Sequence, residues 1–217
     1  MKVVVVASGE LHASDAAWLD TAGLVLAADG GAASLVRLGR RPELVVGDLD
    51  SVDPALLARL EASGTRVERH PIDKEASDTE LAVEAACRAG ATQIVLLGAM
   101  GGERLDHELA NLLLLADPAL AGLDVRAVRD GTVVRALHAG RELLLLGMAG
   151  DLVTLLPVGG DALGVTTEGL RWSLDAETLR IGRSRGLSNE VTRPPASVRI
   201  GEGTLLVVET PSRGENP

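Results

Sequence analysis

The first 130 residues alternate between short apolar runs and longer amphipathic stretches. Runs rich in valine, leucine and alanine predict buried strands at residues 3–7, 24–28, 44–46, 93–97 and 125–128, with a short extended segment at 66–69. Helical spacing and capping signals predict helices at residues 13–19, 32–38, 54–64, from 77 onward and at 108–116. Strands that alternate with helices are typical of an α/β domain with an open, mostly parallel sheet.

The pattern changes after Asp130. Short strand-like runs punctuated by glycine and proline follow one another there, at residues 133–137, 142–146, 152–156, 163–167, 179–181, 197–200 and 204–209. This spacing predicts an all-β sandwich. We therefore expect an α/β domain over residues 1–130 and a β-sandwich domain over residues 131–217. The join between them is short, so we expect the two domains to pack together.

Composition and charge narrow the function classes. The net charge of −10 argues against nucleic acid and anionic membrane surfaces as partners, and a phosphate substrate would need a metal ion or a local basic patch. The single cysteine, Cys87, excludes a disulfide within the chain and suits a reducing compartment. We find no signal peptide and no apolar run of the roughly 18–20 residues that span a bilayer. The sequence therefore predicts a cytoplasmic protein without membrane or nucleic-acid partners.

The most informative polar residues lie in the stretch LVVGDLDS, residues 44–51. Asp48 and Asp50 stand one residue apart after a predicted strand, and alternate side chains of extended backbone point the same way. Two carboxylates held that close repel each other unless a cation lies between them. Mg²⁺ suits such a site because it binds one or two protein carboxylates together with substrate phosphates. The alternative is a plain turn, since Gly, Asp and Ser are turn formers.

Further polar residues fall at the carboxyl ends of the predicted strands, where open α/β sheets bind their ligands. The Asp-Gly-Gly at 29–31 follows the second strand, Asp78 opens a helix, and Asp106 and His107 follow a later strand. Asp29 has an alternative as a turn residue, Asp78 as a complement to the helix dipole, and Asp106 as a helix N-cap. Several carboxylates at one edge would repel one another without a metal, which favours the metal interpretation.

A glycine-rich loop, GAMGGERLDH at residues 98–107, follows the strand predicted at 93–97. Its glycines make the backbone permissive enough for amides to approach a phosphate, although the pattern is neither a Walker A sequence nor GxGxxG in its usual setting. Lys74 and Arg104 are the nearby cations. Together with Mg²⁺ they could neutralise a triphosphate.

Six stretches resemble, in order, the motifs of the thiamine pyrophosphokinase (thiamine diphosphokinase) family. They are ADGG at 28–31, GDLDS at 47–51, DKEASDTE at 73–80, GGERLDHELAN at 101–111, GLRW at 169–172 and GLSNE at 186–190. Each stretch is weak evidence alone, but the ordered set is specific. The resemblance implies an α/β domain, a β-sandwich, and the conversion of ATP and thiamine to AMP and thiamine diphosphate. It also implies a homodimer in which the partner's β-domain covers the catalytic edge.

The resemblance also implies site residues. Mg²⁺ would be held by Asp48, Asp50 and Asp78, which form the catalytic set together with Lys74 and Arg104. The ATP-binding set is Asp29, Gly30, Gly31, Ser51, Lys74, Gly101, Gly102, Arg104, Asp106 and His107. The thiamine-binding set is Trp172, Ser188, Asn189 and Asn111. Glu75, Ser77 and Glu103 depart from the family pattern, so no role is carried over to them.

Alternative functions fit the residues as well. Pyrophosphoryl transfer to another hydroxymethylated heterocycle, such as a pterin, would use the same chemistry. A regulatory module could bind a nucleotide without turnover, and a metal-dependent phosphohydrolase could use the aspartates to activate water. Trp172, followed later by Ser-Asn-Glu, favours a ring-binding pocket over the hydrolase, because an aromatic face binds a planar or cationic ring. Burial in the sandwich core is the structural alternative for Trp172.

Overall fold

The computed structural model describes residues 1–212 of the chain. Contacts divide the chain into two compact units, the first formed by residues 1–114 with 123–130 and the second by residues 115–122 with those from 131 onward. Within the part of the chain that the structure describes, no helix is both long and apolar enough to cross a membrane.

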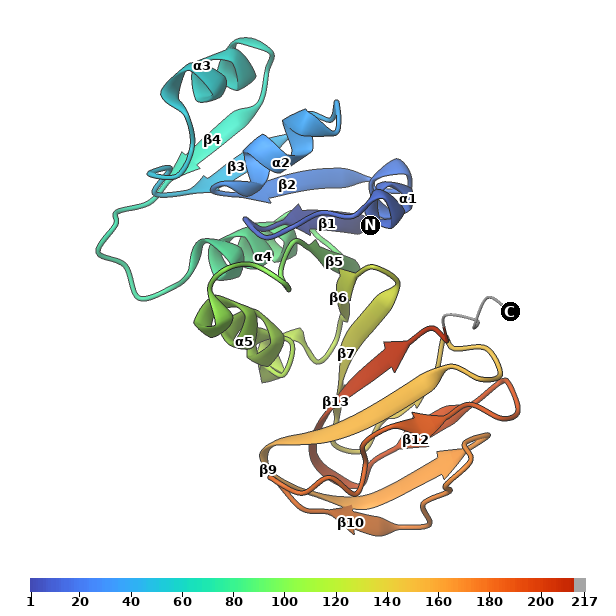
Figure 1. Ribbon diagram of the computed structural model, residues 1–217. Helices are drawn as coiled ribbons and strands as arrows, with labels where there is room; N and C mark the ends of the chain where they lie inside the picture. Colours follow the sequence, from blue (N-terminus) through green and yellow to red (C-terminus); the bar gives the residue numbers. More distant parts are fainter. Residues whose placement is uncertain (213–217) are drawn as a thin grey trace. The chain divides into compact units, whose positions relative to one another are not determined.

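The first unit is built on a parallel sheet with the strand order β4-β3-β2-β1-β5-β6 (Figure 1). Its strands are β1 Lys2–Val6, β2 Leu24–Ala28, β3 Leu44–Gly47, β4 Arg66–Arg69, β5 Gln93–Leu97 and β6 Asp124–Arg129. After their first residue, the central strands β1 and β5 are apolar and buried, as parallel strands covered on both faces must be. The predicted α/β domain with a parallel sheet is confirmed.

Helices connect these strands. They are η1 Ala13–Asp15, α1 Ala16–Asp20, α2 Gly31–Arg37, α3 Pro54–Ala62, α4 Asp78–Arg88 and α5 Leu105–Leu114. The capping signals act as predicted: Asp53 accepts a hydrogen bond from the Ala55 amide, and Ser77 accepts one from the Glu80 amide. The cap at Ser77 matters for the site because it fixes Asp78 as the first residue of α4.

The chain reverses its direction of travel across the sheet at β1, since β2, β3 and β4 lie on one side of β1 and β5 lies on the other. The loops after β1 and β5 therefore meet at this switch point, where the Gly9 amide donates to the Gly98 carbonyl at 2.9 Å. A Cβ on Gly9 would lie 2.3 Å from that carbonyl oxygen, so the approach requires glycine. Crevices at such switch points bind ligands in open α/β sheets.

The second unit consists of antiparallel strands around a core of its own. They are β7 Thr132–His138, β8 Glu142–Leu144, β9 Leu152–Glu168, β10 Glu177–Leu179, β11 Asn189–Glu190, β12 Ser197–Arg199 and β13 Glu202–Thr210, and η2 Pro118–Leu120 belongs to the same unit. The core joins Val153 and Val207 from one layer with Val165 and Val198 from the other. The predicted β-sandwich is confirmed (Figure 1).

Two predicted strands are one. Residues 152–156 and 163–167 belong to the continuous strand β9, whose first half pairs with β13 and whose second half pairs with β10 and β12. Gly159 and Gly164 have positive φ values of 75° and 65° inside the strand. They let β9 bend from one layer of the sandwich into the other.

The helix predicted at 108–116 begins earlier, at Leu105, and ends at Leu114. Asp106 is therefore a residue of the first helical turn, and the N-cap alternative for it is wrong. The apolar run continues past the helix, but Asp117 and Pro118 begin a separate 3₁₀ turn, so the run does not mark the helix end.

Candidate functional site

Three carboxylates converge at the carboxyl ends of the parallel strands. Asp29 follows β2, Asp48 follows β3, and Asp78 opens α4. One oxygen from each lies within 4.8 Å of the others, so a single cation could contact all three. We call this set the carboxylate group. It contains two of the three predicted metal ligands, together with Asp29, which the sequence analysis placed with ATP.

The backbone at the end of β3 leaves room for this convergence. Gly47 has a φ of 149°, and a Cβ there would lie 2.9 Å from Asp78 Oδ1 and 3.2 Å from Asp29 Cβ. Any side chain at Gly47 would push the two aspartates apart. The glycine that ends the strand is therefore part of the site.

Asp29 is the most buried member of the carboxylate group, with 5% of its surface exposed. Its Oδ1 has no hydrogen-bond partner within the described residues. Burial raises the pKa of this carboxyl, although Ser51 and the Gly30 amide oppose the rise. An unpartnered, buried carboxylate oxygen aimed at two further carboxylates is the arrangement that a divalent cation completes, and three hard oxygen ligands fit Mg²⁺.

The ammonium group of Lys74 partly neutralises the negative charge of the carboxylate group. Its Nζ lies 2.6 Å from Asp48 Oδ2 and 3.0 Å from Asp78 Oδ1, with only 13% of its side chain exposed. The hydrogen bond from Lys74 lowers the pKa of the Asp48 carboxyl. Burial alone would lower the pKa of Lys74, but the two carboxylates outweigh it and raise that pKa.

Asp50 lies outside the carboxylate group. The expectation that Asp48 and Asp50 face the same way rested on extended backbone. The backbone there is not extended, because β3 ends at Gly47 and Leu49 has a φ of 65°, so the shared direction of the two side chains stays a prediction. Asp50 is exposed and accepts a hydrogen bond from the Ser51 hydroxyl at 2.9 Å. Its charge still acts on Asp29, so Asp50 borders the site from the solvent side.

The glycine-rich loop is held by side chains that the sequence analysis did not assign to the site. The Gly101 amide, expected to be open to phosphate, donates to Glu108 Oε2 at 3.0 Å. A Cβ on Gly101 would lie 2.3 Å from the guanidinium carbon of Arg129, so Arg129 packs on this glycine. Arg129 is the last residue of β6, and a basic residue at that strand end is the signal that could have revealed it.

Arg104, Asp106 and His107 are exposed at the start of α5. Arg104 binds Asp106 through two hydrogen bonds of 2.9 and 2.6 Å, and this contact holds the pKa of Asp106 well below its usual range. Among the described residues, no ion pair joins Arg104 to the carboxylate group. Asn111, predicted to bind thiamine, is buried and donates to the Ala99 carbonyl at 3.0 Å, which ties α5 to the loop.

The glycines after Asp29 have a packing role of their own. Gly31 begins α2, and a Cβ there would lie 2.0 Å from the Val6 carbonyl oxygen. A Cβ on Gly30 would lie 3.1 Å from the Ser8 hydroxyl. The Asp-Gly-Gly sequence thus brings the start of α2 close to β1, and ATP binding by these glycines stays a prediction.

In the second unit, Trp172 is exposed, with 52% of its surface accessible, so burial in the sandwich core is excluded. The Arg171 guanidinium lies 5.4 Å from the centre of its ring. Arg171 in turn pairs with Glu190 at 2.7 Å, so one contact of the ring is fixed by a neighbouring ion pair. Arg171 and Glu190 were not predicted as site residues.

Asn189 holds the backbone of Trp172. Its Nδ2 donates to the Trp172 carbonyl at 2.7 Å, and its Oδ1 accepts from the Trp172 amide at 3.1 Å and the Glu190 amide at 2.9 Å. These bonds use the Asn189 amide for positioning, whereas the prediction gave it to thiamine. Ser188 beside it is exposed and has a φ of 56°, and its amide donates to Thr154 Oγ1.

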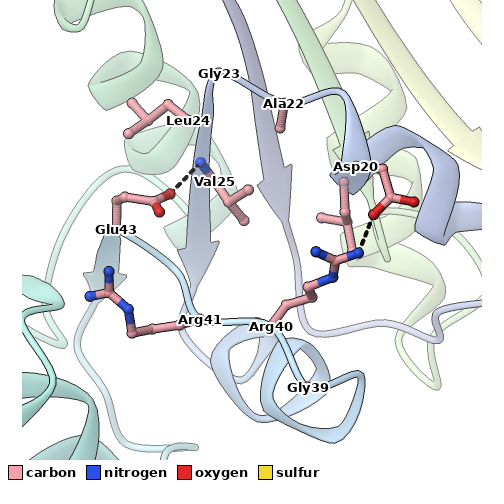
Figure 2. A pocket seen from close by; sticks show the side chains of 10 residues that line it. Asp20, Ala22, Gly23, Leu24, Val25, Gly39, Arg40, Arg41 and Glu43 are labelled. Carbon is pink, nitrogen blue, oxygen red and sulfur yellow. Dashed lines mark hydrogen bonds and ion pairs between the residues drawn. The ribbon is translucent and has the colours of Figure 1, made fainter.

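A hollow of about 430 Å³ lies at the opposite edge of the first unit's sheet, where β2 and β3 begin (Figure 2). Its charged groups already have partners, since Arg40 pairs with Asp20 and Glu43 accepts from the Val25 amide at 2.8 Å. Arg41 donates to the Ser63 carbonyl at 3.0 Å. The carboxylate group is therefore a better candidate for the reactive site than this hollow.

Two family models match the chain in order. Residues 16–127 match "Thiamin pyrophosphokinase, catalytic domain", and residues 144–205 match "Thiamin pyrophosphokinase, vitamin B1 binding domain". The first match contains the whole carboxylate group and Lys74, and the second contains Trp172, Ser188 and Asn189.

Named relatives agree with these models. The chain is 26% identical over 176 residues to "Thiamine pyrophosphokinase 2" of Oryza sativa subsp. japonica, an alignment that covers 77% of this chain but 65% of that protein. It is 22% identical over 187 residues to the thiamine pyrophosphokinase of Bacillus subtilis, covering 86% of this chain and 87% of that protein. The crystal structure of thiamine pyrophosphokinase from Bacillus subtilis superimposes with a TM-score of 0.85 at 22% identity, covering 98% of this chain and 100% of that chain. The last comparison shows a shared fold.

Proposed function

The chain belongs to the thiamin pyrophosphokinase family, and on that premise we propose that it transfers a diphosphate group from ATP to the hydroxyl of thiamine. The products are thiamine diphosphate and AMP. The observation that carries this proposal is the ordered match of both family models, with the carboxylate group in the first matched segment and an exposed aromatic ring in the second.

The proposed reaction exchanges one phosphorus–oxygen bond for another. The thiamine oxygen forms a bond to the β-phosphorus of ATP, the bond from that phosphorus to the oxygen of the α-phosphate breaks, and AMP leaves. Such transfers depend on positioning and charge neutralisation more than on covalent help from the protein. Mg²⁺ bound to Asp29, Asp48 and Asp78 would neutralise phosphate charge.

Protein residues supply the remaining roles. Lys74 contacts the phosphates from inside the site, and Arg104 reaches them from the exposed start of α5. Asp50 stays a proposed metal ligand at the solvent side of the carboxylate group. Either Asp50 or Asp78 accepts the proton of the thiamine hydroxyl.

The nucleotide is proposed to lie along the loops at the same sheet edge. The residues proposed to line it are Asp29, Gly30, Gly31, Ser51, Gly101, Gly102, Asp106 and His107. Support comes from the switch point between β1 and β5, where the loops approach each other closely.

Thiamine recognition is proposed for the exposed face of Trp172. The ring stacks on the aminopyrimidine or attracts the cationic thiazolium, and the Ser188 hydroxyl donates to a pyrimidine nitrogen. Asn189 acts through Trp172 by fixing its backbone.

We further propose a homodimer in which the thiamine residues of one copy complete the carboxylate site of the other. Apolar side chains left exposed in both units support an interface between copies. In the first unit they form a row along α5, made by Leu105, Leu109 and Leu113, which are 66%, 52% and 54% exposed. A cytoplasmic location is also proposed, and the single cysteine supports it.

The test is a product assay. The protein is incubated with ATP, Mg²⁺ and thiamine, and the products are separated and weighed by mass spectrometry. We expect equal amounts of AMP and thiamine diphosphate. ADP with thiamine monophosphate would show attack at the γ-phosphorus and reject the mechanism. ATP breakdown that does not depend on thiamine would favour the phosphohydrolase, and turnover with a hydroxymethyl pterin in place of thiamine would favour the other pyrophosphokinase.

A further inference from the structure

The ammonium group of Lys74 lies against the carboxylates that could bind a metal ion. Its ammonium contacts Asp48 Oδ2 and Asp78 Oδ1, two of the three carboxylates that can share a cation. Opposite charges at these distances attract strongly at the effective dielectric of a protein surface. The ammonium therefore stabilises the carboxylate group substantially when no divalent ion is bound.

The same geometry makes Lys74 a competitor of a divalent cation. A cation bound to Asp48 and Asp78 would take the oxygens that the ammonium now contacts. If the ammonium stayed at this distance, it would repel the incoming charge. Asp29 Oδ1 has no hydrogen-bond partner among residues 1–212, so Lys74 satisfies the group only in part.

The surroundings of Lys74 allow its side chain to move away from Asp48 and Asp78. It lies between β4 and α4 in a segment without helix or strand, where the Lys74 amide donates to the Ile72 carbonyl at 3.1 Å and Ile72 is 75% exposed. A lysine side chain carries its charge on a flexible four-carbon stem. A triphosphate arriving at the same edge would offer this charge a new anionic partner.

Resting on the metal and ATP sites of the proposed function, we propose that Lys74 is the resident counter-ion of Asp48 and Asp78 and must withdraw before a divalent cation binds. The nucleotide phosphates receive the displaced ammonium. Metal alone consequently binds weakly, and metal and nucleotide each strengthen the binding of the other. Lys74 thereby couples the two binding events and prevents tight metal binding before the nucleotide arrives.

The chain allows a closely matched test because it contains only two lysines, Lys2 and Lys74. Lys74→Met removes the proposed counter-ion. Lys2→Met makes the same change of charge at the far end of β1, where Lys2 contacts Thr21 and the Trp18 ring. Lys74→Arg keeps a positive charge at the site. Binding of Mn²⁺, which reports by electron paramagnetic resonance, is titrated with and without the α,β-methylene analogue of ATP.

Without nucleotide, we expect Lys74→Met to bind Mn²⁺ about tenfold more tightly than wild type, in the range of ordinary coupling between two sites. Lys2→Met and Lys74→Arg should stay within about twofold of wild type. The analogue should tighten Mn²⁺ binding strongly in wild type and only slightly in Lys74→Met, because the coupling has been removed. Unchanged or weaker Mn²⁺ binding by a folded Lys74→Met variant would overturn the proposal.

A second measurement uses the wild-type sequence, so it does not depend on whether a variant folds. Reductive methylation with ¹³C-formaldehyde labels the two lysines and the N-terminal amine while keeping their charge. Addition of Mg²⁺ without nucleotide should shift the Lys74 resonance and leave that of Lys2 in place, whereas a Lys74 signal unmoved at saturating Mg²⁺ would contradict displacement. Neither experiment needs thiamine turnover, so failure of the proposed reaction would appear separately, in the product assay. If wild type bound no Mn²⁺ even with the analogue, the carboxylate group would not be a metal site and the inference would fall.

Discussion

The two units hold their candidate residues in opposite ways. In the first unit, one buried and two half-buried carboxylates lie close together around the glycine at the end of β3, with one lysine in contact with two of them. In the second unit, the aromatic ring of Trp172 is exposed while its backbone is bound on both sides by Asn189. In the first arrangement, a bound cation would relieve the repulsion between the carboxylates. In the second, a bound ring would cover exposed apolar surface.

This difference indicates which part of each site is already formed. Charges need fixed positions before they can stabilise a transition state, since reorganising them during the reaction would cost energy. An aromatic ring needs only to be oriented correctly to stack on a ligand. Asn189 supports that orientation by bonding the backbone of Trp172. We therefore expect charge changes in the first unit to act on turnover and ring changes in the second to act on thiamine affinity.

The largest effect is expected from Asp48→Asn. We propose that Asp48 holds the metal, and loss of such a carboxylate would cost several kcal/mol of charge stabilisation, where about 4 kcal/mol corresponds to roughly a thousandfold in rate. The measurement is kcat at saturating Mg²⁺, with circular dichroism to confirm the fold. Near-normal activity would show that Asp48 holds no essential metal.

Asp50→Asn is the matched comparison, because it removes the same charge two residues away. We expect a smaller loss of kcat, since Asp50 is exposed and lies outside the carboxylate group. A loss as large as that of Asp48→Asn would instead show that Asp50 contributes as much as the carboxylate group, as a further metal ligand or as the acceptor of the thiamine proton.

The next effect tests whether the two regions act together across a dimer. Asp48→Asn is mixed with a variant that carries both Trp172→Ala and Ser188→Ala, and subunits are allowed to exchange at thiamine concentrations well below KM. If sites are shared, one site of each heterodimer collects both lesions and the other collects none. With equal mixing about half of the dimers are heterodimers, so roughly a quarter of wild-type activity should return. No recovery after proven exchange would mean that each site is built from one chain.

A smaller effect is expected at the ring. Trp172→Ala should raise the KM for thiamine about two- to tenfold, because aromatic stacking contributes about 0.5–1.5 kcal/mol beyond buried area. The KM for ATP should stay near that of wild type. Trp18→Phe, which changes the other tryptophan, is the control and should leave both constants in place. A normal thiamine KM in Trp172→Ala would remove the ring from the binding site.

Asn189→Ala sharpens this prediction, because it keeps the ring and removes its backbone contacts. We expect a similar rise in the thiamine KM, and little further rise when it is combined with Trp172→Ala, since residues that act through one contact are not additive. Additive effects would instead show that Asn189 touches thiamine directly.

The sequence was sufficient for the strands and helices of the first unit, because their apolar periods are strong and their caps are local. It was also sufficient to bring Asp48, Lys74 and Asp78 to one place, since all three lie near the carboxyl edge of a parallel sheet. The positive φ of Leu49 was not visible, because leucine seldom adopts it and no neighbouring residue signals it. That torsion shows that the backbone between Asp48 and Asp50 is not extended.

The contacts that the sequence did not predict have a common physical cause: the hydrogen-bond partner lies far along the chain or in another element. Asn189 contacts Trp172 across 17 positions, and Asn111 contacts Ala99 across 12. The sequence analysis assigned both side chains to thiamine, and their internal hydrogen bonds become visible only in the folded chain. Strand β9 was divided because glycine signals a turn in the sequence but permits a bend in a paired strand.

The smallest expected effect is on stability, and it tests the contrast between the two units most directly. Asp29→Asn should raise the free energy of unfolding by about 1 kcal/mol when measured in EDTA at pH 7, a gain typical of relieving strain at a functional site. Burial raises the pKa of Asp29, which means that the ionised carboxyl is unfavourable in the folded state at neutral pH. The asparagine amide can donate to the neighbouring carboxylates, whereas the aspartate repels them.

Asp53→Asn is the control for this measurement, because it removes one acidic charge at the N-cap of α3, where asparagine caps as well as aspartate. Its stability should remain within a few tenths of a kcal/mol of wild type. Adding Mg²⁺ with the α,β-methylene analogue of ATP should then reverse the order, since wild type gains stability from the bound ligands and Asp29→Asn gains much less. If Asp29→Asn were instead less stable than wild type in EDTA, the carboxylate would be supporting the fold, and the contrast between a repulsive first site and a satisfied second site would be lost.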